Sequence, residues 1–148
     1  MEEQEHRCRR TKKTSLEIEI MILCDTNILI ELYKGNKNII SELKKIGTVH
    51  ISISIVTSAE LIFGAINKKE LNQIKKDIDS LNLITIDEQI CDIFIDLMLK
   101  YSLSHKITLP DALIAATALS RGFQLYTLNL KDFKFIENLK LYKPVTKS

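Results

Sequence analysis

The sequence predicts a single α/β domain in which a mostly parallel sheet lies between two layers of helices. Short apolar segments rich in β-branched residues alternate with longer segments whose apolar residues recur at helical spacing. Repeated β–α units of this kind form parallel sheets with helices on both faces. The 148 residues, 45% hydrophobic and 27% charged, fit one ordinary globular domain. We therefore expect a three-layer α/β/α domain over residues 16–148, preceded by a flexible N-terminal extension, residues 1–15.

Five segments have the composition of strands. Residues 18–24 form a continuous apolar run rich in isoleucine, which is typical of a strand buried on both faces. Residues 49–56 alternate in polarity and are β-branched. Shorter strands are expected at 83–86, 123–128 and 139–142. Together these segments would form the sheet.

Six segments are predicted to be helices from their apolar spacing and their end signals. Thr26 or Asn27 can cap the first helix and Gly35 can end it, while Pro110 and Gly122 mark the first turn and the end of the last. The predicted helices cover residues 26–35, 37–47, 57–69, 70–82, 87–103 and 109–122.

Composition narrows the class of protein. Cys8, Cys24 and Cys91 form neither a disulfide framework nor a metal-binding pair, which favours reduced thiols. Neither a signal peptide nor an apolar run of the roughly 18 residues that span a bilayer is apparent, so we predict a cytoplasmic protein. The net charge of +2 does not by itself indicate nucleic-acid binding. The basic run 7–13 is either a solvated tail or an RNA contact.

Other catalytic patterns are not found. The four glycines are isolated, so there is no Gly-rich phosphate loop, and no serine has the surroundings of a nucleophile elbow. His50 and His105 lack triad partners at a recognisable spacing. These observations argue against nucleotide-cofactor enzymes and serine hydrolases.

Acidic and amide side chains follow the predicted strands. Asp25 comes directly after the first strand, and Glu60 lies four residues beyond the second, in the first turn of its helix. Asp111 is in the first turn of the last helix, and Asn129 and Asp132 follow the strand after it. Because parallel strands end at one edge of a sheet, we expect these side chains to converge there.

Carboxylates that converge need a cation. Several of them cannot stay ionised within a few ångströms unless cations neutralise them or their pKa values rise. Oxygen ligands without cysteine or histidine favour Mg²⁺ or Mn²⁺. Such ions activate water and stabilise charge on a phosphodiester. The chemistry implied is phosphodiester hydrolysis.

A purely structural interpretation is also available for each carboxylate. Thr57 to Glu60 and Thr108 to Asp111 both have the spacing of a capping box, and Asp25 has the place of a simple N-cap. Each cap would contribute about 1 kcal/mol to stability. The joint placement of these residues at strand ends is what favours a functional site.

Four motifs in the chain resemble those of the PIN-domain ribonucleases. They are LCDTNILIEL, ISIVTSAELIFGA, LPDALIAATAL and LYTLNLKDFKFI, which occur in family order across residues 21–142. The resemblance implies a three-layer PIN fold and a metal-dependent endoribonuclease. The pattern is similar to that of VapC-type toxins, which implies an RNA substrate, a cognate antitoxin that blocks the active site, and a homodimer.

The resemblance also implies roles for single residues. Asp25, Glu60 and Asp111 would bind Mg²⁺ or Mn²⁺, and Thr26 and Asn27 would orient the first of them or the attacking water. Many relatives have Asp where this chain has Asn129. Either Asp132 replaces that fourth ligand, or Asn129 holds a water or a phosphate. Six lysines either flank an RNA groove or are simply solvated: Lys34, Lys37, Lys68, Lys69, Lys131 and Lys134.

The sequence also allows two other functions. A haloacid-dehalogenase-like phosphatase would use Asp25 as its nucleophile, but it needs a second Asp where this chain has Asn27. A catalytically silent PIN domain would only bind RNA or a protein partner. RNA cleavage in Mg²⁺ and in EDTA distinguishes the nuclease from both.

Overall fold

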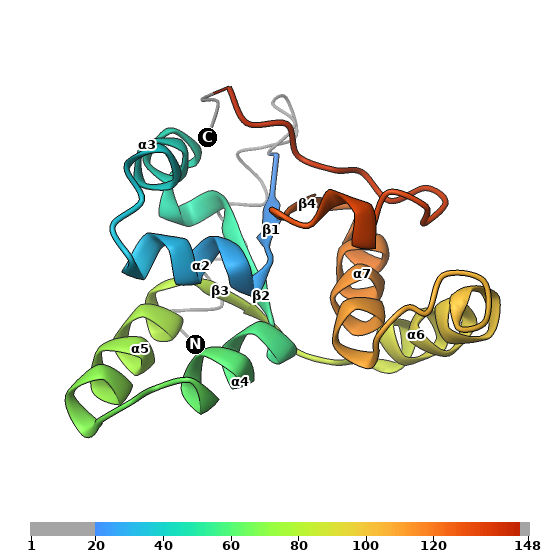
Figure 1. Ribbon diagram of the computed structural model, residues 1–148, viewed down its shortest axis with the longest axis horizontal. Coiled ribbons are helices and arrows are strands. Elements are labelled where there is room, and N and C mark those ends of the chain that lie inside the picture. Colours follow the sequence, from blue (N-terminus) through green and yellow to red (C-terminus); the bar gives the residue numbers. More distant parts are fainter. Residues whose placement is uncertain (1–19, 146–148) are drawn as a thin grey trace, which may run out of the picture.

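A computed structural model describes residues 20–145, and its sheet has four parallel strands. In spatial order these are β3 (Asn82–Ile84), β2 (Ile51–Ser54), β1 (Ile22–Cys24) and β4 (Gln124–Tyr126) (Figure 1). Every neighbouring pair is parallel. The predicted parallel sheet is therefore confirmed, and the proposed extension 1–15 lies outside the described residues.

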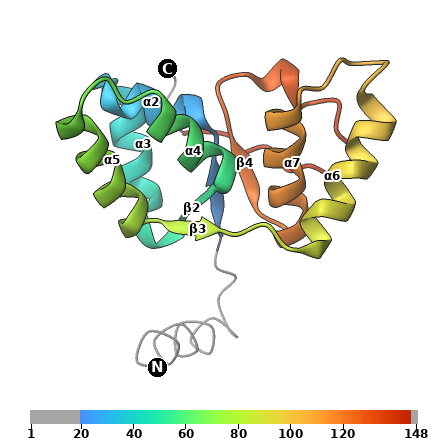
Figure 2. The ribbon, with the colours of Figure 1, turned by 90° about the horizontal axis from the view of Figure 1, so that it is seen from below.

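Within the described part of the chain, six α-helices cover the two faces of this sheet. Figure 2 shows α6 and α7 on one side and the other four on the opposite side. The helices are α2 (Thr26–Tyr33), α3 (Lys37–Ile46), α4 (Ile55–Phe63), α5 (Lys68–Ser80), α6 (Glu88–Tyr101) and α7 (Leu109–Arg121), with two 3-10 turns at Thr48–His50 and Leu130–Asp132. The expected three-layer α/β/α architecture is confirmed.

Side chains along β1 point alternately to the two faces of the sheet, so β1 contributes to a hydrophobic cluster on each face. Leu23 packs in the cluster of α6 and α7, whereas Ile22 and Cys24 pack in the cluster that contains Ile28 of α2 and Leu43 of α3. All of these side chains are at most 7% exposed. Successive strand residues point to opposite faces, so an apolar strand between two helix layers needs an apolar residue at every position.

The observed strands are shorter than the predicted ones. The predicted strand 49–56 is reduced to β2, because Ile55 and Val56 already belong to α4, and the predicted strand 123–128 is reduced to β4. The predicted strand 139–142 is reduced to one parallel bridge between Leu125 and Leu141. Its hydrogen bonds are the Leu125 N–H to the Lys140 carbonyl and the Tyr142 N–H to the Leu125 carbonyl, both 2.8 Å. Of the predicted strand 18–24, residues 18 and 19 lie outside the described residues, and the strand hydrogen bonding within 20–24 covers only β1. Within residues 20–145, no helix combines the length and apolar character needed to cross a membrane.

Candidate functional site

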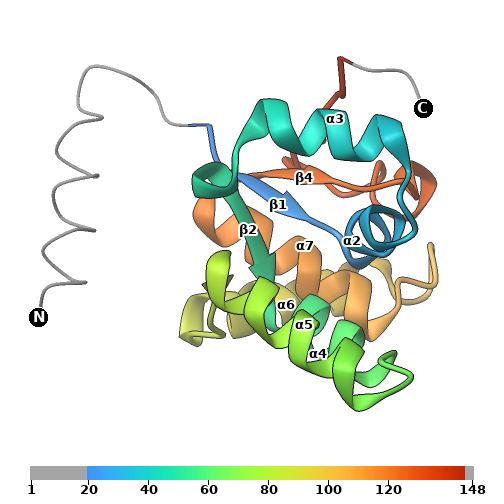
Figure 3. The same cartoon turned by 90° about the vertical axis from the view of Figure 1, so that its left-hand side faces the viewer.

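Asp25 lies at the carboxyl end of β1, where the chain turns directly into α2 (Figure 3). Its backbone N–H donates to the carbonyl of Tyr126 in β4 (2.9 Å), which fixes the position of this residue against the neighbouring strand. The side chain is 6% exposed. Its Oδ1 accepts from the Thr26 N–H and its Oδ2 accepts from the Thr127 hydroxyl, both at 2.8 Å. Both carboxylate oxygens are therefore held in place.

Thr127 holds the loop after β4 as well as the Asp25 carboxylate. Its Oγ1 accepts from the Asn129 N–H (3.0 Å) and from Nδ2 of Asn27 (3.4 Å). Asn27 Oδ1 in turn accepts from the Leu128 N–H at 3.3 Å. A hydroxyl has one donor and two acceptor positions, so the hydrogen-bonding capacity of Thr127 is fully used. Asn27 thus joins α2 to the loop after β4, rather than contacting the Asp25 carboxylate.

Thr26 connects Asp25 to Glu60. The Thr26 hydroxyl donates to Oε1 of Glu60 at 2.7 Å and lies 3.1 Å from the hydroxyl of Thr57. Thr26 is 8% exposed and Thr57 is fully buried, so two elements far apart in sequence meet through polar groups. The carboxylate of Glu60 is thereby directed toward the end of β1.

The expected position of Glu60 in its helix was wrong. The helix α4 begins at Ile55, because Ser54 caps it by accepting from the Thr57 N–H at 3.1 Å. With 3.6 residues per turn, Glu60 belongs to the second turn. Its side chain is therefore not part of a capping box, and the structural interpretation that competed with a functional role does not hold for this residue.

Asp111 lies in the first turn of α7, as expected. Thr108 is the N-cap, and its Oγ1 accepts from the Asp111 N–H at 3.2 Å. Burial raises the pKa of Asp111 to about 6; the charges of Asp25, Asp132 and Glu60 contribute in the same direction, and the Thr108 hydroxyl opposes them. Asp111 is thus within electrostatic reach of every other carboxylate predicted for the site.

The pKa of the buried Asp25 is also raised. Burial raises its pKa, and the charges of Glu60 and Asp132 raise it further, although the hydrogen bonds from Thr127 and Thr26 lower it. Four carboxylates therefore share one edge of the sheet. We call this group the carboxylate rim; it consists of Asp25, Glu60, Asp111 and Asp132.

Asn129 directly precedes the 3-10 turn Leu130–Asp132, and Asp132 is the last residue of that turn. Asn129 is the residue before this turn and is exposed, whereas Asp132 is partly buried and precedes Phe133, which is 1% exposed and anchors the segment in the core. The segment forms no α-helix, and within residues 20–145 no backbone N–H donates to the Asp132 carboxylate. Asp132 is therefore not a helix cap.

The donor set suits a hard divalent cation. All four members of the carboxylate rim offer oxygen, and burial raises the pKa values of two of them, Asp25 and Asp111. No three acidic, histidine or cysteine side chains within residues 20–145 already meet at one metal-binding point. Mg²⁺ retains several waters and uses one or two protein carboxylates, so a hydrated ion fits this arrangement.

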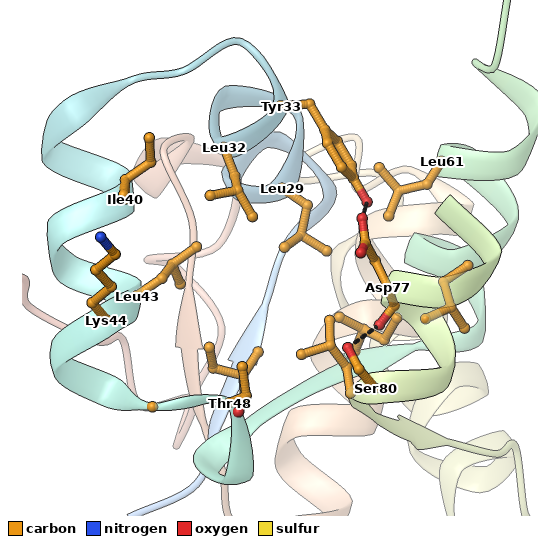
Figure 4. Close-up of a pocket in the computed structure, with 15 residues that line it drawn as sticks. Leu29, Leu32, Tyr33, Ile40, Leu43, Lys44, Thr48, Leu61, Asp77 and Ser80 are labelled. Atoms are coloured by element: carbon orange, nitrogen blue, oxygen red, sulfur yellow. Dashed lines mark hydrogen bonds between the residues drawn. The ribbon is translucent and has the colours of Figure 1, made fainter. Parts of the chain in front are cut away.

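Two cavities flank α2, and one of them reaches the carboxylate rim at Glu60. The Glu60 groove, about 640 Å³, includes Lys34, Glu60 and Lys69. The apolar cavity, about 450 Å³, lies among α2, α3, α5 and the sheet; its apolar lining includes Leu29, Leu32, Leu43, Ile53 and Ile78 (Figure 4). Tyr33 and Leu61 line both. Figure 4 shows Tyr33 directed at Asp77, to which its hydroxyl donates at 2.6 Å.

Sequence comparison identifies the family. Residues 22–137, most of this chain, match the PIN domain, so the chain belongs to the PIN-domain family. This excludes the phosphatase alternative.

The relatives include named ribonucleases. Ribonuclease VapC10 of Mycobacterium tuberculosis is 36% identical over 124 residues, which cover 81% of this chain and 91% of that protein. A toxin–antitoxin complex from Klebsiella pneumoniae contains a chain that is 31% identical, with a TM-score of 0.70, covering 84% of this chain and 99% of that one. VapBC-1 from Haemophilus influenzae gives 30% identity and a TM-score of 0.70 over 84% of this chain and 98% of that one.

Proposed function

We propose that this chain is a divalent-metal-dependent endoribonuclease, the VapC-like toxin of a toxin–antitoxin pair. The observation that carries the proposal is the hydrogen-bonded connection from Thr127 through Asp25 and Thr26 to Glu60. It holds two carboxylates from different helices at the edge of the sheet where Asp111 and Asp132 also lie. The names of the relatives, Ribonuclease VapC10 among them, support the reaction class.

Asp25, Glu60 and Asp111 would hold the ion, Mg²⁺ or Mn²⁺, directly or through its waters, and Asp132 or Asn129 would complete the site. A bound ion would activate a water and stabilise the charge that develops on the phosphodiester. The chain's own residues prepare the site: Thr127 and the Thr26 N–H fix the Asp25 carboxylate, and the Thr26 hydroxyl fixes Glu60. Asn27 acts indirectly, by holding the loop that carries Thr127.

Cleavage of RNA in the presence and absence of metal tests this function. Purified protein should cut a mixed-sequence single-stranded RNA in Mg²⁺ or Mn²⁺, stop in EDTA, and recover when the ion is restored. A chain that binds the RNA but leaves it intact in every ion would be a catalytically silent PIN domain. End-mapping of the products then identifies the bond that is cut.

We also propose that the cognate antitoxin covers the carboxylate rim. The apolar cavity accepts apolar side chains of the antitoxin, and the adjoining Glu60 groove leads to the carboxylate rim. A charge-assisted hydrogen bond from an arginine to a desolvated carboxylate is strong and would compete with the metal. Asp25→Asn should therefore weaken the complex. An antitoxin that bound this variant and wild type equally would show that it acts elsewhere.

The chain is also proposed to form a homodimer in the cytoplasm. Large apolar side chains are exposed around the end of α4: Phe63 is 93% exposed, Ile66 82% and Ile62 44%. Exposed apolar clusters mark protein interfaces. Phe63→Ser should shift the mass measured by light scattering toward the monomer, with Val145→Ser, another exposed apolar position (79%), as the control.

The free thiols Cys24 and Cys91 are consistent with a reducing compartment.

A further inference from the structure

A third cavity, of about 370 Å³, lies beyond the end of β4, between the first turn of α3 and the chain after the Leu125–Leu141 bridge. We call it the β4-end cavity. Its lining includes Asn38, Thr127, Leu128, Leu130, Lys134 and Lys143. It is separate from the Glu60 groove and from the apolar cavity, because it shares no lining residue with either.

We propose that the β4-end cavity binds one unpaired nucleobase of the RNA substrate, beside the phosphodiester that is cleaved. This inference rests on the proposed ribonuclease function. Leu128 and Leu130 line the cavity yet are 42% and 51% exposed, so apolar surface faces water there. A base placed against these side chains removes that surface from water. The volume lies at the small end of ligand pockets, about 300–1,000 Å³, and suits a nucleoside.

The polar groups of the cavity match a nucleotide better than an acidic or purely apolar ligand. Lys134 and Lys143 are exposed ammonium groups, which attract the phosphates on either side of a bound base. The Asn38 carboxamide has no hydrogen-bond partner among residues 20–145 and can both donate to and accept from a base edge. No carboxylate lines this cavity.

Thr127 connects base binding to cleavage. It lines the β4-end cavity, and its hydroxyl donates to Oδ2 of Asp25 at 2.8 Å. A nucleotide whose base occupies the cavity therefore has a neighbouring phosphate beside the carboxylate rim. Unpaired bases are the usual targets of sequence-specific RNA recognition, because their edges and faces are accessible.

Binding of mononucleotides to metal-free protein tests the cavity without requiring cleavage. With leucine methyl groups labelled for NMR, AMP, CMP, GMP and UMP are titrated in EDTA beside ribose 5-phosphate, which lacks a base. At least one nucleotide should shift the methyl signals of Leu128 and Leu130 but not those of the exposed Leu99 on α6. It should bind about tenfold more tightly than ribose 5-phosphate, because only the base covers the apolar surface of Leu128 and Leu130.

Three outcomes would overturn the proposal. They are unmoved methyl signals at the cavity, equal affinity for ribose 5-phosphate, and signals that shift with protein concentration alone, which would show a second copy in the cavity. Leu130→Gln should weaken nucleotide binding and raise the KM for RNA cleavage about fivefold with little change in kcat, whereas Leu99→Gln should change neither. Wild-type cleavage of RNA without nucleotide binding would refute only the cavity. Nucleotide binding without cleavage would refute the ribonuclease.

Discussion

The inner and outer parts of the carboxylate rim differ in how firmly they are held. Asp25 is 6% exposed and both of its oxygens accept hydrogen bonds from fixed groups. Glu60 is exposed, and a single hydroxyl, that of Thr26, holds it. Asp111 and Asp132 are half-exposed. The inner carboxylate is thus set in place by the fold, whereas the outer ones can adjust to an ion.

This difference separates the expected effects of substitution. Changes to Asp25 or its partners should reduce cleavage because the geometry of the fixed ligand is lost. Changes to Asp111 and Asp132 should alter how much metal is needed, or how stable the metal-free chain is.

The largest effect is expected from Asp25→Asn. An amide keeps the size and one acceptor of the carboxylate but not its charge, so the fold should remain while cleavage in Mg²⁺ falls at least about 100-fold. Initial cleavage rates and circular dichroism of the same samples measure both. Asp92→Asn, an exposed carboxylate on α6, is the matched control and should cleave like wild type. Comparable rates for the two variants would remove Asp25 from the site.

Thr127→Val should reduce cleavage about 10- to 100-fold, because it removes the donor that fixes Oδ2 of Asp25. It also leaves the Asn129 N–H without its acceptor, which should lower the free energy of unfolding by about 1–2 kcal/mol. Thr127→Ser restores the hydroxyl and should recover most of the activity. A serine variant as slow as the valine variant would show that the methyl group, and not the hydrogen bonds, matters.

Asn129 and Asp132 should tune the metal requirement by a few-fold. Asp132→Asn removes an outer negative charge and should raise the Mg²⁺ concentration for half-maximal cleavage, whereas Asn129→Asp adds one and should lower it. Titrating the cleavage rate of each variant and of wild type against Mg²⁺ measures both changes. If Asp132→Asn leaves the half-maximal concentration unchanged, the site has three acidic ligands.

Asp111→Asn should change stability in a direction that depends on pH. Burial and the neighbouring charges raise the pKa of Asp111 to about 6, above its unfolded value of 3.8. The stability from this group is therefore present below about pH 4 and lost as pH rises through about 6. At pH 7.5 in EDTA the variant should be more stable than wild type by roughly 1 kcal/mol, allowing for solvent screening. A lower melting temperature would mean that Asp111 only complements the helix dipole.

Much of the fold and part of the rim followed from local patterns. Apolar β–α alternation predicts a parallel sheet, and the rule that strand ends share one edge brings Asp25 and Asp132 together. The exact start of α4 did not follow, because Ser54 and Thr57 are both cap-type residues. The structure selects Ser54, whose Oγ accepts from the Thr57 N–H, and this moves Glu60 into the second turn.

Thr127 shows what local patterns cannot provide. Thr127 lies in the motif LYTLNLKDFKFI, but no local pattern gives it a role, because its role depends on the pairing of Cys24 in β1 with Tyr126 in β4. That pairing joins positions about a hundred residues apart and brings the hydroxyl to Asp25. The apolar and β4-end cavities were missed for the same reason, since both depend on how helices and loops pack around the sheet.

The most direct test of the account is RNA cleavage by Glu60→Gln, measured in Mg²⁺ beside Glu88→Gln, an exposed glutamate in the first turn of α6. The Thr26 hydroxyl can still donate to the amide oxygen, so the melting temperature in EDTA should stay close to that of wild type. If the carboxylate rim binds the catalytic ion, Glu60→Gln should cleave at least about 100-fold more slowly while Glu88→Gln cleaves normally. Near wild-type cleavage by a folded Glu60→Gln variant would contradict the proposed active site.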